Sequence, residues 1–387
     1  MNGVLMDFSL SAQHQVFRRT VAEFVEKEVV PRVPEMEARA EWPTDLFRRM
    51  GELGYFGLRY PEKYGGAGGD AILFAIFLEE LARGYMSLAA AAMMQCLMGT
   101  NFIYRFGTEE QRERLLVPAI RGEKIGTIAM TEPGAGSDLG AITTRAVRDG
   151  DEYVIEGGKT WITSATRADF FTVAAKTSPD PKVGFKGIDM FLVEKGTPGL
   201  TVGNQIHKVG VVASETSELT FRQVRVPKEN LFGGREGFGF AALREILNEI
   251  RVMTGALGLG LARAARDESL RYAHERTAFG RKIGDFQAIQ HKLAEMETRI
   301  ELSRLVVYYG AWLIDQNQPC NKEAAIAKYY ATEAGVAGAD EATRIFGAYG
   351  MAMEMTPQRL FRDGRFLLYG GGTSEVLKNI IAKEMGV

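Results

Sequence analysis

Cysteine and histidine are scarce in this chain of 387 residues, and their scarcity excludes several kinds of site. The two cysteines, Cys96 and Cys320, lie far apart in helical patterns, which favours small buried hydrophobic side chains over a disulfide. The four histidines show no spacing typical of metal ligands, so we expect no metal site. They are His14, His207, His274 and His291.

Excess charge of one sign and long apolar runs are also missing. The chain has 47 Lys and Arg against 49 Asp and Glu, with no basic run, so we expect no nucleic-acid partner. No apolar stretch approaches the roughly 20 residues that a membrane span needs. Met1–Asp7 resembles neither a secretory signal nor a transit peptide, and Met6 reads as the natural start after a short extension. These absences predict a cytoplasmic protein.

The hydrophobic pattern changes twice along the chain and predicts three parts. Over residues 6–124 apolar residues recur at helical spacing, as in Leu10–Glu28. Over 125–237, short runs rich in Val, Ile, Thr and Phe alternate with Gly, Asp and Pro, and Asp149-Gly150 is typical of a hairpin turn. Over 238–387, amphipathic helices return that are long enough for a four-helix bundle. The fold class is therefore α+β: a helical domain, a β-barrel-like or sandwich domain, and a helical bundle.

One loop stands out at the start of the β-rich part. Thr131–Asp138 reads TEPGAGSD and follows a β-like run, Gly126–Met130. Proline fixes one dihedral and the two glycines allow turns that other residues avoid. Such a turn brings backbone N–H groups and the hydroxyls of Thr131 and Ser137 close to a flat, polar ligand. An ordinary Gly-Pro turn is the alternative reading of the loop taken alone.

Six further motifs follow this loop in the chain. They are Lys159–Ser164, Glu275–Gly280, Phe286–Gln290, Arg344–Gly350, Arg362-Asp363 and Gly370–Glu375. In this order and spacing the motifs closely resemble the acyl-CoA dehydrogenase family, from Asp7 to the C-terminus. The resemblance implies an FAD enzyme that oxidises the α,β carbon–carbon bond of an acyl-CoA thioester and passes electrons to an electron-transfer flavoprotein. It also implies the three-part fold above, usually as a homotetramer.

The resemblance implies where FAD would bind. A flavin needs a flat slot with hydrogen bonds for its ring, cations or N–H donors for its pyrophosphate, and an apolar pocket for its adenine. Ile128, Met130 and Thr131 would lie along the ring. Trp161 and Thr163 would cover its other side, and the tryptophan would keep water away. A plain core residue is the alternative reading of Trp161.

The rest of the cofactor would be held by residues from the last part of the chain. The family takes Arg276, Phe279 and Gln287 from the neighbouring subunit, and a planar, always-charged guanidinium suits a diphosphate. A surface salt bridge is the alternative role for Arg276. The residues implied to line the adenosine end and close over the cofactor are Arg344, Gly347, Ala348, Thr373 and Glu375. The family commonly has a Gln or Glu at the position of Arg344 and a second glycine at that of Ala348.

Neither usual position of the catalytic base carries a carboxylate. The chemistry needs a base to remove the α-proton while hydride leaves the β-carbon. Most of the family places a Glu where this chain has Gly371, after an aromatic or aliphatic residue where it has Gly370. A subset acting on branched or long acyl chains places it just before a conserved arginine, which matches Arg251 here. The residue before that arginine is Ile250.

Two nearby glutamates are candidate bases. Glu249 is adjacent to the alternative position, and one residue turns a helix by about 100°. Glu245 lies one turn earlier on a nearby face. A solvated helix face, or a salt bridge to Arg244 or Arg251, is the alternative reading for both.

The acyl pocket is expected to be roomy and apolar. Gly370–Gly372 remove side-chain volume where the acyl tail meets the flavin, and Leu88–Met94 would form the far wall. The family's glutaryl branch carries an arginine near Ala89, so glutaryl is disfavoured. By resemblance Ser137 and Arg251 hold the CoA portion. A branched, ring-bearing or longer acyl group is therefore favoured, with simple helix packing as the alternative reading.

Other functions compete with dehydrogenation. An enoyl-CoA reductase or a flavin oxidase could use the same scaffold, and the missing base keeps a non-catalytic flavin- or CoA-binding protein open. A helical scaffold without cofactor would require the motifs to match by accident. Gly255–Gly260 resembles a dinucleotide-binding loop, but it lacks a preceding strand and the G-x-G-x-x-G spacing. Close helix packing is the expected role of those glycines.

Overall fold

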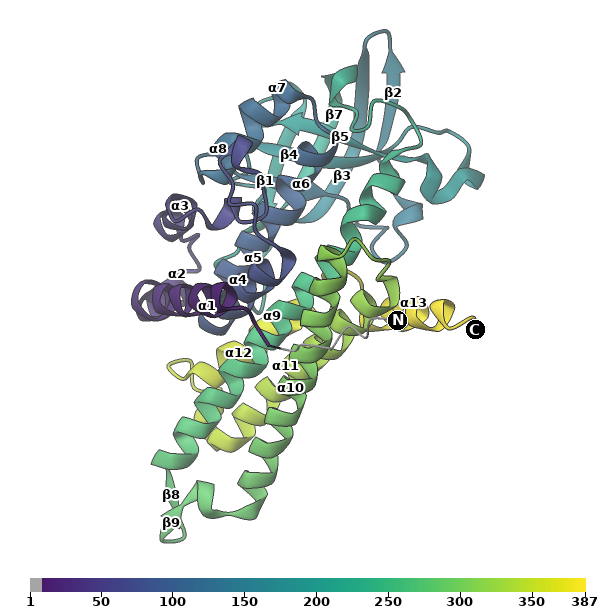
Figure 1. Cartoon of the computed structure of the whole chain (residues 1–387). Coiled ribbons are helices and arrows are strands. Elements are labelled where there is room, and N and C mark those ends of the chain that lie inside the picture. The colour runs from purple at the N-terminus through teal and green to yellow at the C-terminus, as the bar shows by residue number, and fades with distance from the viewer. Residues whose placement is uncertain (1–8) are drawn as a thin grey trace.

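A computed structural model describes residues 9–387 as three parts in chain order (Figure 1). Helices come first, a curled sheet follows, and a bundle of long helices ends the chain. This arrangement confirms the α+β fold predicted from the change of hydrophobic pattern. The start expected at Met6 lies outside the described residues.

Eight short helices form the N-terminal part. They are α1 Ala12–Phe24, α2 Val33–Arg39, α3 Thr44–Glu52, α4 Ala71–Gly84, α5 Met86–Met93, α6 Asn101–Phe106, α7 Glu109–Gln111 and α8 Val117–Ile120. A reciprocal capping box between Thr108 and Gln111 opens α7. Every residue of α5 is buried, so this helix lies inside the protein rather than on its surface.

The expectation that no apolar stretch approaches the length of a membrane span was wrong at one place. Met86–Phe106, 21 residues over α5 and α6, is long and apolar enough by composition. Within the protein, 94% of the most apolar window is buried. A helix surrounded by protein on all sides is apolar all round, which explains the composition of this segment.

Seven strands form the sheet of the middle part. They are β1 Gly126–Ala129, β2 Arg145–Asp149, β3 Glu152–Thr163, β4 Phe170–Lys176, β5 Ile188–Glu194, β6 Leu200–Gln205 and β7 Thr216–Pro227. Their order is β1-β4-β2-β3-β7-β6, with β5 paired to β4. The predicted hairpin at Asp149-Gly150 is confirmed, because Asp149 pairs with Glu152 and Gly150 has a φ of 66°.

Long helices build the last part. They are α9 Gly239–Glu275, α10 Gln287–Asp315, α11 Asn321–Phe346, α12 Thr356–Leu367 and α13 Ser374–Glu384. Helix α9 runs from the sheet to the hairpin of β8 Thr277–Ala278 and β9 Arg281–Lys282 at the far end of the molecule (Figure 1). With 37 residues it is about 55 Å long.

The glycines of α9 allow close helix crossings, as expected. A Cβ atom at Gly258 would lie 2.6 Å from the Ala331 carbonyl oxygen of α11. A Cβ atom at Gly260 would lie 2.3 Å from the Glu79 carbonyl oxygen of α4. Both distances are too short for a real side chain, so these glycines serve packing and not a dinucleotide.

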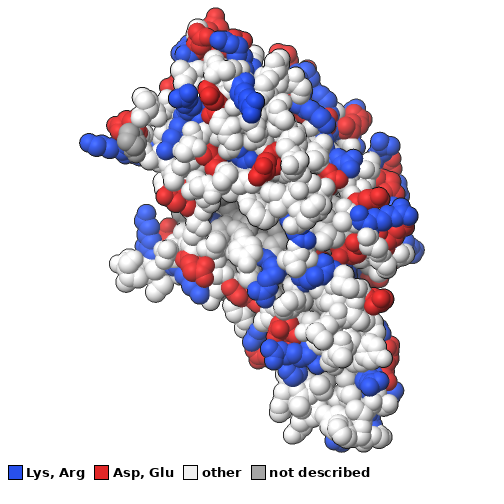
Figure 2. All heavy atoms as spheres, turned by 180° about the vertical axis from the view of Figure 1, so that it is seen from behind, with Lys and Arg blue, Asp and Glu red and all other residues white. Residues whose placement is uncertain are grey.

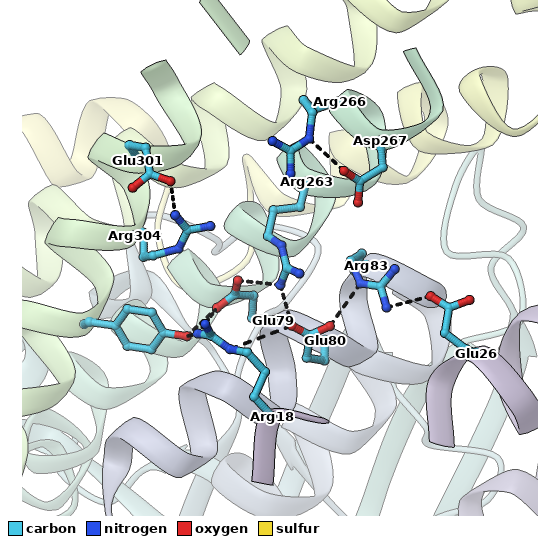
Figure 3. Close-up of polar contacts among 11 residues, drawn as sticks. Arg18, Glu26, Glu79, Glu80, Arg83, Arg263, Arg266, Asp267, Glu301 and Arg304 are labelled. Carbon is cyan, nitrogen blue, oxygen red and sulfur yellow. Dashed lines mark hydrogen bonds and ion pairs between the residues drawn. The ribbon is translucent and has the colours of Figure 1, made fainter. Parts of the chain in front are cut away.

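A buried charge cluster joins the N-terminal helices to the bundle (Figure 3). Glu79 and Glu80 on α4 are both only 1% exposed. Arg263 of α9 donates to both carboxylates, at 2.6 and 2.5 Å. Arg18 of α1 and Tyr308 of α10 complete the cluster through Glu79. Buried charges are tolerated when paired in this way, so the cluster fixes α4 against the bundle.

A buried aspartate links α12 to the middle part. The Asp363 carboxylate accepts a hydrogen bond from the Val211 backbone N–H at 2.6 Å, and its other oxygen has no partner among residues 9–387. Burial, with Glu37 nearby, raises the pKa of Asp363 to about 6, against smaller opposing effects of Arg359 and Arg362.

This raised pKa predicts a pH-dependent stability. A carboxylate whose pKa rises on folding favours the folded state at low pH, and that contribution is lost as the pH rises through 6. Between pH 4 and pH 7 the free energy of unfolding should fall by up to about 3 kcal/mol relative to Asp363→Asn, which cannot titrate. Urea unfolding of both proteins at several pH values measures this difference. Parallel pH profiles would contradict the assignment.

Candidate active site

The ends of β1 and β3 form one wall of the site. The Thr160 N–H donates to the Thr131 carbonyl at 2.9 Å, and the Thr127 hydroxyl donates to the Thr163 carbonyl at 2.7 Å. These bonds bring together five predicted flavin residues, which we call the ring-slot residues. They are Ile128, Met130, Thr131, Trp161 and Thr163.

Trp161 is not a core residue in this chain. Its side chain is 56% exposed, and its φ of 60° lies in the left-handed region. A bulky residue in that region stores backbone strain of order 1–3 kcal/mol, and such strain gathers at functional sites. The strand is also irregular between Lys159 and Ile162. The sheet therefore aims a large aromatic ring outward beside the TEPGAGSD loop.

A buried ion pair holds that loop against β3. The Lys159 ammonium donates to the Glu132 carboxylate at 2.8 Å and to the Met130 carbonyl at 3.0 Å. Glu132 also accepts from the backbone N–H groups of Thr143 and Thr144 at 2.6 and 3.0 Å. The pair thus fixes both the entry and the exit of the loop.

The electrostatics of this pair follow from its burial. Burial opposes the charge of Glu132, but the hydrogen bonds from Lys159, Thr144 and Thr143 overcome it and bring the pKa down to about 2. Burial lowers the pKa of Lys159 to about 8, and Glu132 limits the fall. This pair was not predicted from the sequence, although Glu132 lies in the TEPGAGSD loop and Lys159 begins the motif Lys159–Ser164.

Three predicted FAD residues lie far from the ring slot within one chain. Arg276, Phe279 and Gln287 are exposed around the β8–β9 hairpin, and Phe279 is 96% exposed. Figure 1 places this hairpin at the end of the molecule opposite the sheet. Among residues 9–387 the Arg276 guanidinium has no ion pair, so the surface salt bridge considered for it is absent.

The adenosine-end candidates lie in two further places. Arg344, Gly347 and Ala348 are exposed where α11 ends, and Arg344 pairs with Asp340 at 2.7 Å. Thr373 caps α13 by accepting from the Val376 N–H at 3.4 Å, and Glu375 is exposed in the first turn of that helix. A single chain therefore does not assemble the whole predicted FAD set.

The two usual base positions lie next to each other. A Cβ atom at Gly371 would lie 3.7 Å from Cγ2 of Ile250 and 3.4 Å from the Thr254 hydroxyl oxygen. That hydroxyl lies 3.9 Å from Sδ of Met93, so α5 packs against the same part of α9. The buried Lys328 ammonium donates to the Gly372 carbonyl at 2.8 Å and holds the glycine turn. These residues surround the expected place of the acyl group, and neither usual base position carries a carboxylate.

Glu249 and Glu245 differ sharply in their surroundings. Glu249 is 2% exposed and forms an ion pair with Arg59 from the N-terminal part. Neither Glu249 oxygen has a hydrogen-bond partner among the described residues. The Glu245 side chain is 52% exposed, 3.8 Å from Arg105. Of the two glutamates, only Glu249 is buried next to Ile250. The alternative of a solvated helix face is therefore wrong for Glu249.

The predicted CoA contacts are an exposed serine and a partly buried arginine. Ser137 is exposed in the TEPGAGSD loop. Arg251 donates to the Asn248 side chain at 3.3 Å, and its buried Nε has no partner among residues 9–387. Burial lowers the pKa of Arg251.

A cavity that was not predicted from the sequence lies between residues 183–186 of the middle part and the start of α9. It has a volume of about 540 Å³ and is lined by Phe185, Lys186, Phe240 and Arg244, among others. The rings of Phe185 and Phe240 stack with centroids 4.9 Å apart, and Phe185 lies 3.6 Å from the Cβ position at Gly140. Aromatic and basic side chains around a cavity suit a nucleotide.

The rear face of the molecule carries positively and negatively charged side chains. Figure 2 shows Lys and Arg interspersed with Asp and Glu, and a hollow near the middle of this face, between the sheet part and the bundle. The molecule is thus hollowed where its parts meet.

Comparison with known proteins agrees with this fold. Three family models match: the acyl-CoA dehydrogenase N-terminal domain over residues 11–123, the middle domain over 127–224 and the C-terminal domain over 237–386. Benzylmalonyl-CoA dehydrogenase from Aromatoleum aromaticum is 49% identical over 98% of this chain and 100% of the relative.

Solved structures agree as well. Butyryl-CoA dehydrogenase from Megasphaera elsdenii has a TM-score of 0.95 at 35% identity, covering 99% of this chain and 100% of that one. The FAD complex of PigA has a TM-score of 0.94 at 30% identity, covering 98% and 99%. The fold and the site therefore define an oxidoreductase. The chain belongs to the acyl-CoA dehydrogenase family.

Proposed function

We propose that this enzyme removes the α- and β-hydrogens of a ring-bearing acyl-CoA thioester, with FAD as cofactor and Glu249 as the base. The observation that carries the proposal is the buried Glu249 carboxylate, one residue before Ile250, which packs next to Gly371. A general base must be within reach of the proton it removes, and Glu249 is the buried carboxylate next to Ile250 on α9. When bound, FAD supplies the two-electron acceptor for the hydride from the β-carbon.

The residues present fit FAD. The ring slot offers an exposed aromatic side chain in Trp161 and the polar Thr131 and Thr163 along a fixed wall. Arg276 is a cation without an ion-pair partner among residues 9–387, which suits a diphosphate. The Lys159–Glu132 pair keeps the loop of the slot in one conformation.

A second copy of the chain is part of this proposal. Arg276, Phe279 and Gln287 lie beyond the end of a helix about 55 Å long, so they cannot close the ring slot of their own chain. Instead, these three residues of one subunit would complete the FAD site of its neighbouring subunit. A homotetramer, the family's usual assembly, provides this arrangement.

The chain's own residues prepare the proton transfer. Glu249 accepts the α-proton, and its carboxylate is only 2% exposed. Met93, Ile250 and Thr254 exclude water from the pocket, while the Gly370–Gly372 turn leaves room for a ring. A ring-bearing substrate is supported by the 49% identity to benzylmalonyl-CoA dehydrogenase.

CoA would enter past the TEPGAGSD loop. The cavity at Phe185, Phe240 and Arg244 suits its nucleotide end, because two stacked rings and a cation can hold an adenine and a phosphate. Ser137 is exposed in the TEPGAGSD loop, and Arg251 follows Ile250 on α9. An electron-transfer flavoprotein as acceptor and a cytoplasmic location remain predictions from the family and the composition.

Anaerobic mixing with straight, branched and aryl thioesters tests this function. Aryl thioesters should bleach the oxidised-flavin absorbance at least about tenfold faster than butyryl-CoA, because the glycine turn and the small residues of α5 leave space for a ring. The reduced enzyme should react slowly with oxygen. Fast reoxidation by oxygen would indicate an oxidase, and bleaching by no thioester would indicate a reductase or a non-catalytic binder.

A further inference from the structure

The partner of Glu249 comes from outside the bundle. Arg59 follows a short helical turn, Tyr55–Gly57, in the N-terminal part, and its guanidinium carbon lies 5.6 Å from the centre of the Phe74 ring. Among residues 9–387, Glu249 is the one ion-pair partner of the Arg59 side chain. The Glu249 carboxylate has no other ion-pair partner there, so each group neutralises the other inside the protein.

The Arg59 contact affects how strongly Glu249 can bind a proton. A cation in contact with a carboxylate stabilises its charged form and weakens it as a base. Removing the cation from a carboxylate that is only 2% exposed leaves a poorly solvated anion, which binds a proton more strongly. Glu249 therefore gains basicity when another anion takes over Arg59.

Arg251 and Lys328 are two further cations near Ile250 and Gly372, and neither forms an ion pair within 4 Å among residues 9–387. The buried Nε of Arg251 has no hydrogen-bond partner among residues 9–387. The Lys328 ammonium donates hydrogen bonds to backbone carbonyls. Burial lowers the pKa of both groups, and that of Lys328 falls to about 8. The positions where relatives carry an acid, Gly371 and Ile250, are uncharged here. Cations that lack an acidic partner in this region attract an anion.

We propose that the acyl group carries a carboxylate on its α-carbon, and that Arg59 binds this carboxylate and thereby releases Glu249. The inference rests on the proposed dehydrogenation and specifies its substrate class as an α-carboxylated, malonyl-type thioester. In this exchange, the ion pair between Arg59 and Glu249 breaks and an ion pair between Arg59 and the substrate carboxylate forms. The α C–H bond then breaks, its proton forms an O–H bond on Glu249, and the hydride leaves the β-carbon as in the proposed function.

The α-carbon is the position that this geometry favours. A base must reach the α-hydrogen, so a guanidinium in contact with that base lies close to other substituents on the same carbon. A carboxylate at the far end of a long acyl chain would point away from it. Gly371 fits the same substrate, because a glutamate there would place a second negative charge beside the substrate's carboxylate.

Binding of malonyl-CoA and acetyl-CoA tests the inference without turnover. Neither thioester has a β-hydrogen, so neither can be dehydrogenated, and they differ by one carboxylate. Calorimetry with the FAD-loaded protein should give malonyl-CoA at least about tenfold tighter binding, since charge-assisted bidentate bonds to arginine are strong. Arg59→Met should abolish this preference, Arg59→Lys should keep part of it, and the control Arg105→Met should keep all of it.

Two outcomes would overturn the inference. One is equal binding of malonyl-CoA and acetyl-CoA to the unaltered protein, and the other is a malonyl preference that survives both Arg59 variants. Circular dichroism melting shows whether Arg59→Met folds, and Arg59→Lys keeps the test valid if it does not.

Flavin reduction separates this inference from the proposed function. Benzylmalonyl-CoA should reduce the flavin at least about tenfold faster than 3-phenylpropanoyl-CoA, which lacks the carboxylate, and Arg59→Met should remove the difference. Equal reduction by both thioesters would leave the dehydrogenase standing and overturn the role of Arg59. A malonyl-binding preference without reduction by any thioester would overturn dehydrogenation and leave the carboxylate site standing.

Discussion

Glu249→Gln is expected to slow flavin reduction by the preferred aryl thioester by about 10²–10⁴-fold, the range that one general base contributes. Glutamine keeps the size of the side chain and can still contact Arg59, so the pocket should keep its shape. Binding of CoA and retention of the yellow cofactor should stay within about twofold, because the variant removes a proton acceptor and not a wall of the site. Stopped-flow absorbance under anaerobic conditions measures the rate.

Glu245→Gln is the matched control for this experiment. The two glutamates lie one turn apart on α9, but the Glu245 side chain is 52% exposed. The control should reduce flavin at the rate of the unaltered enzyme. Equal rates for the unaltered enzyme and Glu249→Gln would remove Glu249 from the chemistry, and a large loss in Glu245→Gln alone would assign the base to Glu245.

Lys159→Met is expected to lower the free energy of unfolding by about 3–5 kcal/mol, because it leaves the Glu132 carboxylate charged and unpaired inside the protein. Glu132 and Lys159 are only 5% and 1% exposed. The TEPGAGSD loop would lose its tie to β3, so the variant should also lose FAD on gel filtration. Thermal melting with and without added FAD, together with the ratio of flavin to protein absorbance, measures both effects.

A double variant separates the ion pair from the shape of the lysine. Glu132→Gln combined with Lys159→Met removes both charges and should recover more than half of the lost stability, since neighbouring partners are not additive. Thr143 and Thr144 donate their backbone N–H groups to different Glu132 oxygens, so the single glutamine oxygen can keep one of these two hydrogen bonds. A double variant as unstable as the sum of the two single variants would show that the charges do not act as a pair.

Much of the fold was predictable because local patterns and tertiary structure agree. Thr108 is both a good cap in sequence and the observed cap of α7. Asp149-Gly150 forms the predicted hairpin, since a glycine with positive φ suits a tight turn between strands. The glycines Gly255–Gly260 lie at helix crossings, as their spacing within a helical pattern indicated. Acyl-CoA dehydrogenase membership, predicted from separated motifs, is confirmed by family models over all three parts.

The partners of the site's charged residues were not predictable in the same way. Arg59 and Glu249 are 190 positions apart, and neither motif nor period connects them. The cavity at Phe185 and Phe240 joins a loop of the middle part to the first turn of α9. Such contacts depend on how distant elements pack. The roles assigned to the ring-slot residues, Arg276 and Glu249 remain predictions that the experiments above test.

The most direct test of dehydrogenation is the mass of the product. Single-turnover mixing of the FAD-loaded enzyme with benzylmalonyl-CoA, without oxygen, should yield a thioester that has lost two hydrogens in step with the bleaching of the flavin. Mass spectrometry of the quenched mixture measures that loss. Recovery of unchanged thioester, or conversion of an α,β-unsaturated thioester to the saturated form as the only reaction of the reduced enzyme, would contradict the account.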